Sequence, residues 1–389
     1  MSEISYLEKL LDGADVEWLS LGKILVRTKG TKITAGQMKV LHKDNAPLKI
    51  FAGGKTVAFV DYKDIPEKDI NRKPSIIVKS RGVIEFEFYD KPFSHKNEMW
   101  SYHSKNETIN IKYIYYFLKM NEAYFQKVGG KMQMPQISTP DTDKFRVPIP
   151  CPANPEKSLA IQSEIVRILD TFTELTAELT AELSMRKKQY NYYRDQLLSF
   201  DDVEVEWKTL GELAENLDSK RKPITSGLRE AGKIPYYGAS GIVDYVKDYI
   251  FDGDFLLVSE DGANLLARNT PIAFSISGKT WVNNHAHVLK FDTYAERRYV
   301  EYYLNSIDLT TYISGAAQPK LNKKNLESIR IPNPSPEEKE RIVSILDKFD
   351  ALTNSITEGL PREIELRQKQ YAYYRDMLFS FPKQEVAEA

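Results

Sequence analysis

Two short segments of the chain carry the Gly-Lys-Thr ending of a phosphate-binding P-loop, which would indicate a nucleotide-dependent enzyme. They are Gly53–Thr56 (GGKT) and Ser277–Thr280 (SGKT). The glycine that opens a P-loop is missing from both, because Lys49 and Ala273 occupy its place. Without that glycine the backbone cannot form the phosphate cradle. The sequence therefore predicts no nucleotide site.

Two histidines form the other constellation that could do chemistry. His285 and His287 alternate in the segment Trp281–His287 (WVNNHAH), so on a strand they share one face. A metal site would need further ligands, and no cysteine and few acidic residues lie nearby in the sequence. Structural histidines are therefore favoured over a metal site. The single cysteine, Cys151, indicates neither zinc nor an internal disulfide.

Methyl transfer to DNA would need a motif that the chain lacks. Amino-methyltransferases hold the target amino group with an Asn/Asp-Pro-Pro-aromatic loop, and none occurs in the sequence. Neither half shows a cofactor loop or the clustered acids of a nuclease. We therefore assign no catalytic residue, no metal ligand and no cofactor to this chain, which argues against a self-contained enzyme.

Several polar side chains in loops could instead contact DNA. Asparagine amides match the N6 and N7 edge of adenine, while lysine and glutamine donors suit phosphates and base edges. Gly129, Gly130 and Gly315 would allow close backbone approach. The alternatives are solvated loops and, for the asparagines, turn stabilisation. The candidate DNA-binding residues are Lys131, Gln133, Gln136, Tyr236, Tyr237, Ser240, Asn283, Asn284, Gln318, Lys320, Lys323 and Lys324.

Charge is distributed unevenly along the 389 residues, although the net charge is only −1. Leu21–Pro150 contains 23 Lys/Arg and 13 Asp/Glu, a balance of +10, while Thr209–Pro334 contains 15 of each, which leaves −11 for the rest. A basic segment joined to acidic ones suits a polyanion on one face and protein partners on another, and a solvated lysine-rich surface is the alternative. No apolar run could span a membrane, and Met1–Gly13 is unlike a signal peptide, so we predict a cytoplasmic protein.

A repeat of about half the chain must position these residues. The basic, tyrosine-rich segment Arg186–Phe200 recurs as Arg367–Phe381, with 11 of 15 positions identical at an offset of 181 residues. A period of that length indicates a duplicated half rather than a solenoid. Ile111–Lys119 and Arg297–Asn305 are predicted helices at matching places.

Other segments follow the same repeat. The matched pairs are Val16–Ile24 with Val205–Leu213, Gly129–Ser138 with Ser314–Asn322, and Val147–Pro152 with Ile329–Pro334. Trp100 is expected in the place that parallels Trp281, with each tryptophan in a core rather than stacked on a base.

A long helix with a heptad seam is predicted in each half. The seam residues are Ile161, Ile165, Ile168, Phe172, Leu175, Leu179, Tyr190, Tyr193 and Leu197 in the first half, and Ile342, Ile345, Phe349, Leu352, Ile356, Tyr371, Tyr374 and Leu378 in the second. The repeated tyrosines are therefore expected in helix packing rather than on DNA. The simplest partner for each seam is the other copy, which predicts two antiparallel helices.

The two helices are not expected to be equal. Thr173–Leu183 contains a tandem Thr-Ala-Glu-Leu (TAEL), and a four-residue insertion in a heptad is a stutter. Each TAEL lengthens a helix by about 6 Å, the scale of one to two base pairs at about 3.4 Å each. A good helix former without a metric role is the alternative. In the second helix, Gly359 and Pro361 should produce a break or kink.

The expected fold is α+β, with two mixed α/β domains separated by two long antiparallel helices and related by a pseudo-two-fold internal repeat. The predicted boundaries are residues 1–15 for an N-terminal stub that completes the circular repeat, 16–155 and 204–334 for the two mixed domains (the target-recognition domains of the resemblance given next), 156–203 and 335–382 for the helical regions, and 383–389 for a tail.

Over essentially its whole length the chain resembles the specificity subunit of type I restriction–modification systems. The resemblance rests on two variable domains separated by two helical regions, on a GxxQPxL-like turn before an IxIP strand, and on the TAEL tandem followed by Arg186–Phe200. The last combination is similar to the subgroup called IC. In the first half the turn departs from the pattern, with QMPQIS where the second half has QPKLN.

This resemblance implies a non-catalytic bacterial subunit that binds a bipartite DNA sequence, one half-site per recognition domain. It also implies docking of two modification subunits, which hold S-adenosylmethionine and methylate adenine, and of motor-nuclease restriction subunits that use ATP and magnesium. In the subgroup the number of TAEL units resembles a ruler for the spacer. A structural coiled-coil adaptor without sequence-specific DNA binding is the alternative function.

Overall fold

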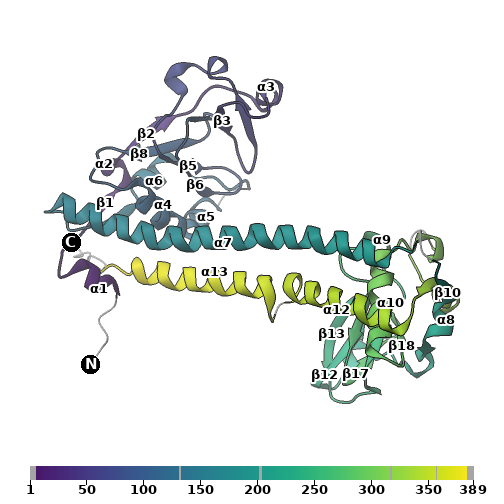
Figure 1. Cartoon of the computed structure of the whole chain (residues 1–389). Coiled ribbons are helices and arrows are strands. Elements are labelled where there is room, and N and C mark those ends of the chain that lie inside the picture. Colours follow the sequence, from purple (N-terminus) through teal and green to yellow (C-terminus); the bar gives the residue numbers. More distant parts are fainter. Residues whose placement is uncertain (1–5, 131–132, 201–203, 316–317, 356, 383–389) are drawn as a thin grey trace. The chain divides into compact units, whose positions relative to one another are not determined.

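The chain folds into two compact units. The computed structural model describes residues 6–130, 133–200, 204–315, 318–355 and 357–382 (Figure 1). The first unit comprises Met1–Glu178 and Ile364–Ala389, and the second comprises Leu179–Glu363. In the described part of the chain, no helix is both long and apolar enough to cross a membrane. The finer domain boundaries drawn from the sequence remain a prediction.

The first unit contains three sheets and several short helices. The four-stranded sheet has the order β2 (Leu25–Lys29), β8 (Trp100–Ser104), β5 (Ser75–Lys79) and β6 (Glu85–Tyr89); the three-stranded sheet has β4 (Val57–Val60), β3 (Leu48–Phe51) and β7 (Phe93–His95); and β1 (Val16–Ser20) pairs with β9 (Arg146–Pro150). The short helices are α1 (Tyr6–Leu11), α2 (Leu21–Ile24), α3 (Ala35–Leu41), α4 (Ile111–Met120), α5 (Glu122–Gly129) and α6 (Thr139–Asp143).

The second unit repeats this arrangement. Its sheets are β11 (Glu215–Asn216), β18 (Ala286–Lys290), β15 (Phe255–Ser259) and β16 (Ala273–Ile276); β13 (Gly241–Val246), β12 (Ala231–Gly238), β17 (Lys279–Val282) and β14 (Phe251–Asp252); and β10 (Glu206–Thr209) with β19 (Arg330–Asn333). Its short helices are α8 (Leu210–Leu213), α9 (Asn264–Ala267), α10 (Tyr294–Ser306) and α11 (Lys323–Glu327). The strand order is the same in both units except that β14 adds a fourth strand beside β17, and the β3–β7 and β12–β17 pairs are both parallel.

Helices α4 and α10 make the same contacts in their own units, which confirms the predicted match between them. The Tyr113 hydroxyl donates to the Pro148 carbonyl at 2.7 Å, and the Tyr299 hydroxyl donates to the Pro332 carbonyl at 3.0 Å. Each hydroxyl thereby ties the buried helix to the proline-containing strand that closes its domain.

A second matched contact joins each of these helices to a long helix. On α4, Lys112 pairs with Asp170 of α7 (Pro155–Leu198) at 2.7 Å. On α10, Arg298 pairs with Asp347 of α12 (Pro336–Thr353) at 2.9 Å. A tyrosine one turn further along, Tyr302 in the second unit, donates to the same carboxylate at 2.7 Å.

The long helices pack in antiparallel pairs within each unit, as the seam predicted. In the first unit, Phe172 of α7 stacks on Tyr374 of α13 (Gly359–Leu378), with ring centroids 5.2 Å apart. In the second unit, Tyr193 of α7 stacks on Phe349 of α12 at 5.7 Å. Aromatic contact of this kind stabilises the helix pair beyond simple burial.

The predicted interruption of the second helix is confirmed. Helix α12 ends at Thr353 and α13 begins at Gly359. Gly359 has φ +71°, and a Cβ there would lie 2.3 Å from the Ala351 carbonyl oxygen, so the turn requires glycine. Pro361 follows in the first turn of α13, where a missing N–H is tolerated.

Candidate nucleic-acid interface

Three loops meet at one edge of the β15–β18 sheet in the second unit. Strand β15 ends at Ser259, which lies opposite Ala286 at the start of β18. The third loop, between the 3₁₀ helix η5 (Thr310–Tyr312) and α11, joins them through a β-bridge from Asp261 to Lys320. The Glu260 N–H donates to the His285 carbonyl at 2.9 Å. Sheet pairing therefore gathers side chains that lie far apart in the sequence.

Backbone hydrogen bonds fix the shape of this loop. The Gly262 N–H donates to the Pro319 carbonyl at 3.2 Å, and the Leu321 N–H donates to the Glu260 carbonyl at 2.8 Å. The loop closes on itself where the Lys320 N–H donates to the Ser314 carbonyl at 2.8 Å. With its backbone held in this way, the loop can present Gln318 and Lys320 to solvent, where both are exposed.

The first unit builds the same edge with different side chains. The Gly82 N–H donates to the Pro135 carbonyl, and the Ile137 N–H donates to the Ser80 carbonyl, each at 2.9 Å. Arg81 forms a β-bridge to Gln136. Gln136 is therefore the structural counterpart of Lys320, and the departure of QMPQIS from QPKLN is a change of side chains on an unchanged backbone pattern.

Most candidate DNA-binding residues lie on the surface. The exposed ones are Gln133, Gln136, Ser240, Asn284, Gln318, Lys320, Lys323 and Lys324, and Tyr237 is partly buried. Lys323 and Lys324 occupy the first turn of α11, directly after the loop, and Lys323 lies 3.6 Å from Glu327. Lys131 lies outside the described residues.

Two candidates are buried and hold turns together. Tyr236 is 1% exposed, and its hydroxyl accepts a hydrogen bond from the Ile224 N–H at 2.9 Å. Asn283 is 7% exposed, and its Oδ1 accepts from the His285 N–H at 2.8 Å. For Asn283 this bond matches the turn-stabilising role that was the alternative to DNA contact. Both residues shape the edge and leave little surface for a base.

The internal repeat identifies interface residues that the sequence did not. The Lys96 N–H donates to the Phe51 carbonyl at 2.9 Å, as the Asn283 N–H donates to the Tyr237 carbonyl at 3.1 Å. The exposed Asn97 is therefore the counterpart of Asn284. Arg81 is also exposed and lies on the same edge. Lys55 is exposed on the β3–β4 turn, which corresponds to the β12–β13 turn that carries Ser240.

A polar pocket adjoins this edge in the first unit. It has a volume of about 540 Å³ and lies where β2 ends. Its lining includes three lysines and two amides, and also two carboxylates: Lys29, Lys32, Lys68, Gln37, Asn97, Asp64 and Asp69. The lysines and amides suit phosphate and base-edge contacts, although the carboxylates offset most of the positive charge. The only signal in the sequence was the basic excess of this half.

The expected parallel between Trp100 and Trp281 is wrong. Trp100 lies in β8 opposite Val78, the place that His287 of β18 holds opposite Val258. Trp281 instead lies in β17 beside Tyr236. Similar residue types in a variable stretch misled the sequence comparison, because only strand pairing fixes the register.

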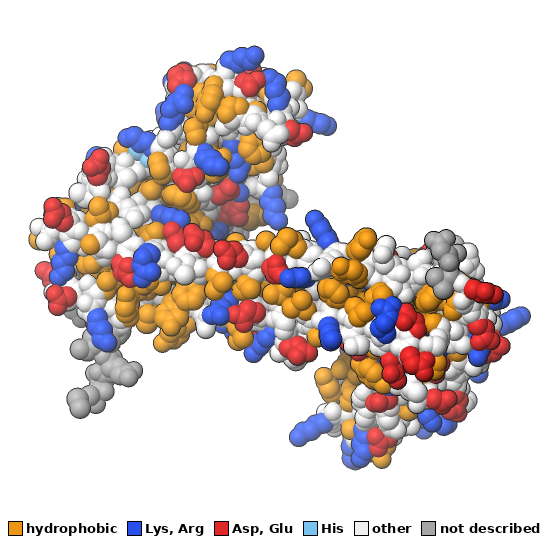
Figure 2. Space-filling model, viewed as in Figure 1, with side chains coloured by type: hydrophobic (Ala, Val, Ile, Leu, Met, Phe, Trp, Pro, Cys, Tyr) orange, Lys and Arg blue, Asp and Glu red, His pale blue; other side chains and the backbone are white. Residues whose placement is uncertain are grey.

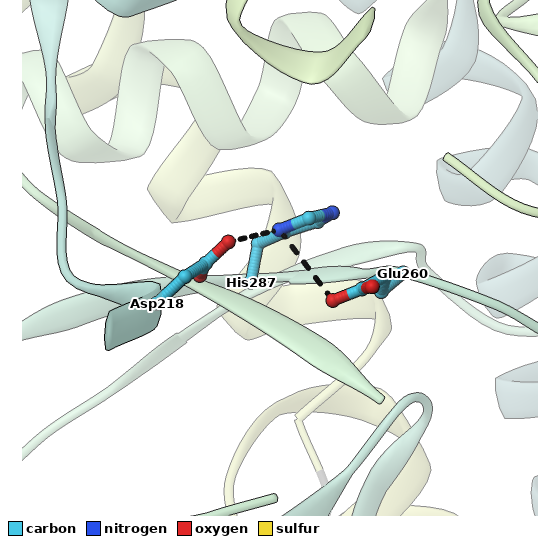
Figure 3. A group of neighbouring side chains, drawn as sticks. All are labelled: Asp218, Glu260 and His287. Atoms are coloured by element: carbon cyan, nitrogen blue, oxygen red, sulfur yellow. Dashed lines mark hydrogen bonds and ion pairs between the residues drawn. The ribbon is translucent and has the colours of Figure 1, made fainter. Parts of the chain in front are cut away.

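His287 belongs to a buried cluster of charged residues (Figure 3). Its Nδ1 lies 2.6 Å from a carboxylate oxygen of Asp218 and 3.8 Å from one of Glu260. Arg221 pairs with Glu260 at 2.6 Å, and Lys320 pairs with the other oxygen of Glu260 at 3.1 Å. Cations of the chain already neutralise these carboxylates, so the group fits an ion-pair network better than a metal site.

The electrostatics of the cluster agree with this assignment. Burial acts to raise the pKa of the Asp218 carboxyl, but His287, the Val288 N–H and Arg221 together outweigh it, so the pKa lies below its usual range. Burial also acts to raise the pKa of the Glu260 carboxyl, but the hydrogen bond from Arg221 and other nearby cations act against it. The pKa of Glu260 is therefore also lowered. Both carboxylates are therefore held ionised. The structural role predicted for His287 is met by its hydrogen bonds.

Comparison with known proteins gives consistent results. The family model described as "Type I restriction modification DNA specificity domain" matches residues 32–185 and 202–366. The chain is 43% identical to the specificity subunit of the Escherichia coli type I restriction enzyme EcoR124I/EcoR124II, over 99% of each chain. It is 36% identical to the specificity subunit of E. coli EcoprrI, over 92% of this chain and 93% of that one.

A solved structure shows the same fold. The crystal structure of the type I restriction–modification S subunit from M. genitalium matches with a TM-score of 0.66, at 17% identity, over 96% of this chain and 98% of that one.

Proposed function

Since the chain belongs to the family of type I restriction–modification DNA specificity subunits, we propose that it binds a bipartite DNA target, with one half-site read by each unit. As a specificity subunit it is the recognition component of such an enzyme and not the catalytic one. The observation that carries the proposal is the pair of loop edges, which share a backbone pattern and differ in side chains. Two loop edges with the same backbone pattern but different hydrogen-bond donors suit the recognition of two different half-sites.

The proposed readers are the exposed residues of these edges. In the second unit they are Ser240, Asn284, Gln318, Lys320, Lys323 and Lys324, and in the first unit they are Gln133 and Gln136 together with Lys55, Arg81 and Asn97. Amides and arginine supply base-edge contacts, and lysines neutralise phosphates. Tyr237 is half-buried and lies three residues before Ser240 in the sequence.

The proposed protein partners are two modification subunits and the restriction subunits. Relatives are named as specificity subunits of type I restriction enzymes, and the family resemblance implies methylating and cleaving subunits beside them. S-adenosylmethionine, ATP and magnesium belong to those partners. A bacterial cytoplasmic location follows from the same proposal, because the target is DNA.

The proposed docking surfaces for the modification subunits lie on the long helices. Tyr192 and Tyr193 are 59% and 40% exposed, and their repeat counterparts Tyr373 and Tyr374 are 67% and 38% exposed. Figure 2 shows hydrophobic side chains gathered along this helical region. In the first unit the second pair lines an apolar groove of about 470 Å³ with Tyr6, Ile168 and Met377. Exposed aromatic pairs of this kind are typical interface anchors.

The proposal is tested by sequencing the methylome of cells that express this chain with and without matched modification subunits. A bipartite adenine-methylated motif is expected only when both are present. Absence of any such motif, with the complex verified as assembled, would contradict the proposal and favour a structural adaptor.

A further inference from the structure

His287 makes two hydrogen bonds, one to a side-chain carboxylate and one to a backbone carbonyl. Its Nδ1 faces Asp218 at 2.6 Å, and its Nε2 faces the backbone carbonyl of Leu321 at 2.7 Å. The ring is fully buried, and both partners are hydrogen-bond acceptors. The imidazole therefore donates from both nitrogens.

The second of these bonds completes the attachment of the proposed DNA-binding loop. The Leu321 N–H donates to the Glu260 carbonyl at 2.8 Å, and the Leu321 carbonyl accepts from His287. The side chain of Lys320, one residue earlier, pairs with the Glu260 carboxylate at 3.1 Å. The Leu321 backbone and the Lys320 side chain therefore both bind the same buried network.

The remaining contacts of the network hold His287 itself in place. Asp218 accepts from the Val288 N–H at 3.0 Å through its other oxygen, and Arg221 donates to the Ala286 carbonyl at 2.8 Å. Val288 is therefore tied to the carboxylate that binds the ring of His287, and Ala286 is tied to Arg221, which pairs with that same carboxylate at 3.3 Å. Hydrogen bonds at both nitrogens hold the orientation of the ring.

The first unit has a different residue at the position that corresponds to His287. Trp100 occupies the position of His287, and its indole N–H donates to the Thr142 hydroxyl at 3.2 Å. This bond is directed at α6 and not at the loop carbonyl. The two units therefore differ in how the reading loop is attached.

We propose that His287 is a positioning residue for the second half-site, because it sets the geometry of the loop that carries Gln318 and Lys320 through its bond to the Leu321 carbonyl. The inference rests on the proposed DNA recognition by this loop. It makes no claim of contact between His287 and DNA.

Two amide substitutions separate this role from simple packing. A glutamine at 287 places its amide N–H near the position of Nε2 and can reach the Leu321 carbonyl. An asparagine places its amide near Nδ1 and reaches only Asp218. His287→Gln and His287→Asn are both neutral and polar, so they differ chiefly in whether the loop bond is kept.

The measurement is methylation by the full complex with its modification subunits, on duplexes that carry a single base change in one half-site or the other. His287→Asn should lower discrimination at one half-site by about tenfold, the size of one lost charge-assisted hydrogen bond. His287→Gln should keep it within about twofold by the same scale. Discrimination at the other half-site is the internal control and should not change.

The outcomes are distinguishable. Loss at both half-sites, or at neither, in a folded His287→Asn complex would overturn the inference, as would loss in a folded His287→Gln complex. If His287→Asn does not assemble, Asp218→Asn decides, because asparagine can donate to Nδ1 while the neutral ring still donates to Leu321. It should retain discrimination, and loss there overturns the inference. Failure of the proposed function itself would appear as no bipartite methylation by the wild type.

Discussion

Gln136 and Lys320 occupy the same place in two copies of one loop but carry different chemistry. Gln136 offers a neutral amide that can both donate and accept, while Lys320 offers a cation that donates only. The same holds for Arg81 and Asp261 across the bridge. Recognition by the two units can therefore differ through side chains alone.

Lys324 gives a direct test of phosphate contact. It is exposed in the first turn of α11 beside the reading loop. Lys324→Gln should weaken DNA binding more at low salt than at high salt, and lower the slope of log affinity against log salt by about one, because each neutralised phosphate contributes about 0.9. Lys348→Gln, at an exposed lysine of α12 in the same unit, is the control and should leave the slope unchanged. Equal loss at both salts would argue against a phosphate contact.

The lowered pKa values of Asp218 and Glu260 predict acid sensitivity of the second unit. The unfolded chain binds protons to these carboxyls at a higher pH than the folded unit does. Their stabilisation is therefore fully present above the ordinary carboxyl pKa of about 4 and is lost as pH falls through the lowered folded values. Hydrogen exchange of β15 and β18 between pH 7 and 3 reports this unit by itself.

Asp218→Asn should make that loss of protection shallower. Asp252→Asn, at an exposed carboxyl of the same unit, should reproduce the wild-type pH dependence. An Asp218→Asn protein with wild-type acid sensitivity would contradict the assignment of this network as the source.

Single residues were the hardest level to predict from the sequence. Lysine, glutamine and asparagine types in loops identified Gln318, Lys320 and Asn284 correctly as exposed. Periodicity could not show that Tyr236 turns inward, since both faces of β12 are partly covered, or that Asn283, in the turn after β17, is buried. Arg81 and Lys55 were missed because distant strand pairing brings them to the edge.

Among the elements, helices were predicted best because their contacts are periodic and local. The match of Ile111–Lys119 with Arg297–Asn305 is confirmed residue by residue in the bonds of Tyr113 and Tyr299. Loops were predicted less well. The first-half turn departs from the family pattern in sequence, but its backbone bonds at Pro135 repeat those at Pro319.

Gly315 tests whether the loop backbone matters for recognition. It has φ +83°, and a Cβ there would lie 2.5 Å from the Gln318 carbonyl oxygen. Gly315→Ala should therefore strain the loop by about 1 kcal/mol or more and reduce discrimination at one half-site. Gly227→Ala, where a Cβ meets nothing within 4 Å, is the matched control and should be silent in methylation assays. A fully active Gly315→Ala complex would mean that the loop does not need its present shape.

At the scale of the whole molecule, the boundary between the two units crosses the TAEL tandem. The first TAEL, Thr176–Leu179, includes the last residues of the first unit, and the second, Thr180–Leu183, lies in the second unit. Helix α7 is continuous through it. An insertion here lengthens the helix without entering either core, which is what the ruler implied by the resemblance requires.

Adding one TAEL should therefore lengthen the preferred spacer and leave both half-site sequences intact. The added rise is about 6 Å, which corresponds to one to two base pairs at about 3.4 Å per pair. Methylome sequencing of the variant gives half-sites and spacer together. An insertion of four residues into the η5–α11 loop serves as the contrasting variant, since it should impair a half-site rather than the spacer. An unchanged spacer in the TAEL variant would refute the ruler.

The first unit closes its core with residues from the far end of the chain. Phe379 lies 5.4 Å from the rings of both Tyr113 and Phe117, and the Trp18 indole donates to the Pro382 carbonyl at 2.8 Å. The second unit draws on one continuous stretch, Leu179–Glu363. On the ribosome, the second unit thus has all its residues while the first still lacks part of its core. We therefore expect the half that is synthesised first to complete its folding last, because its aromatic core includes Phe379, which directly follows α13.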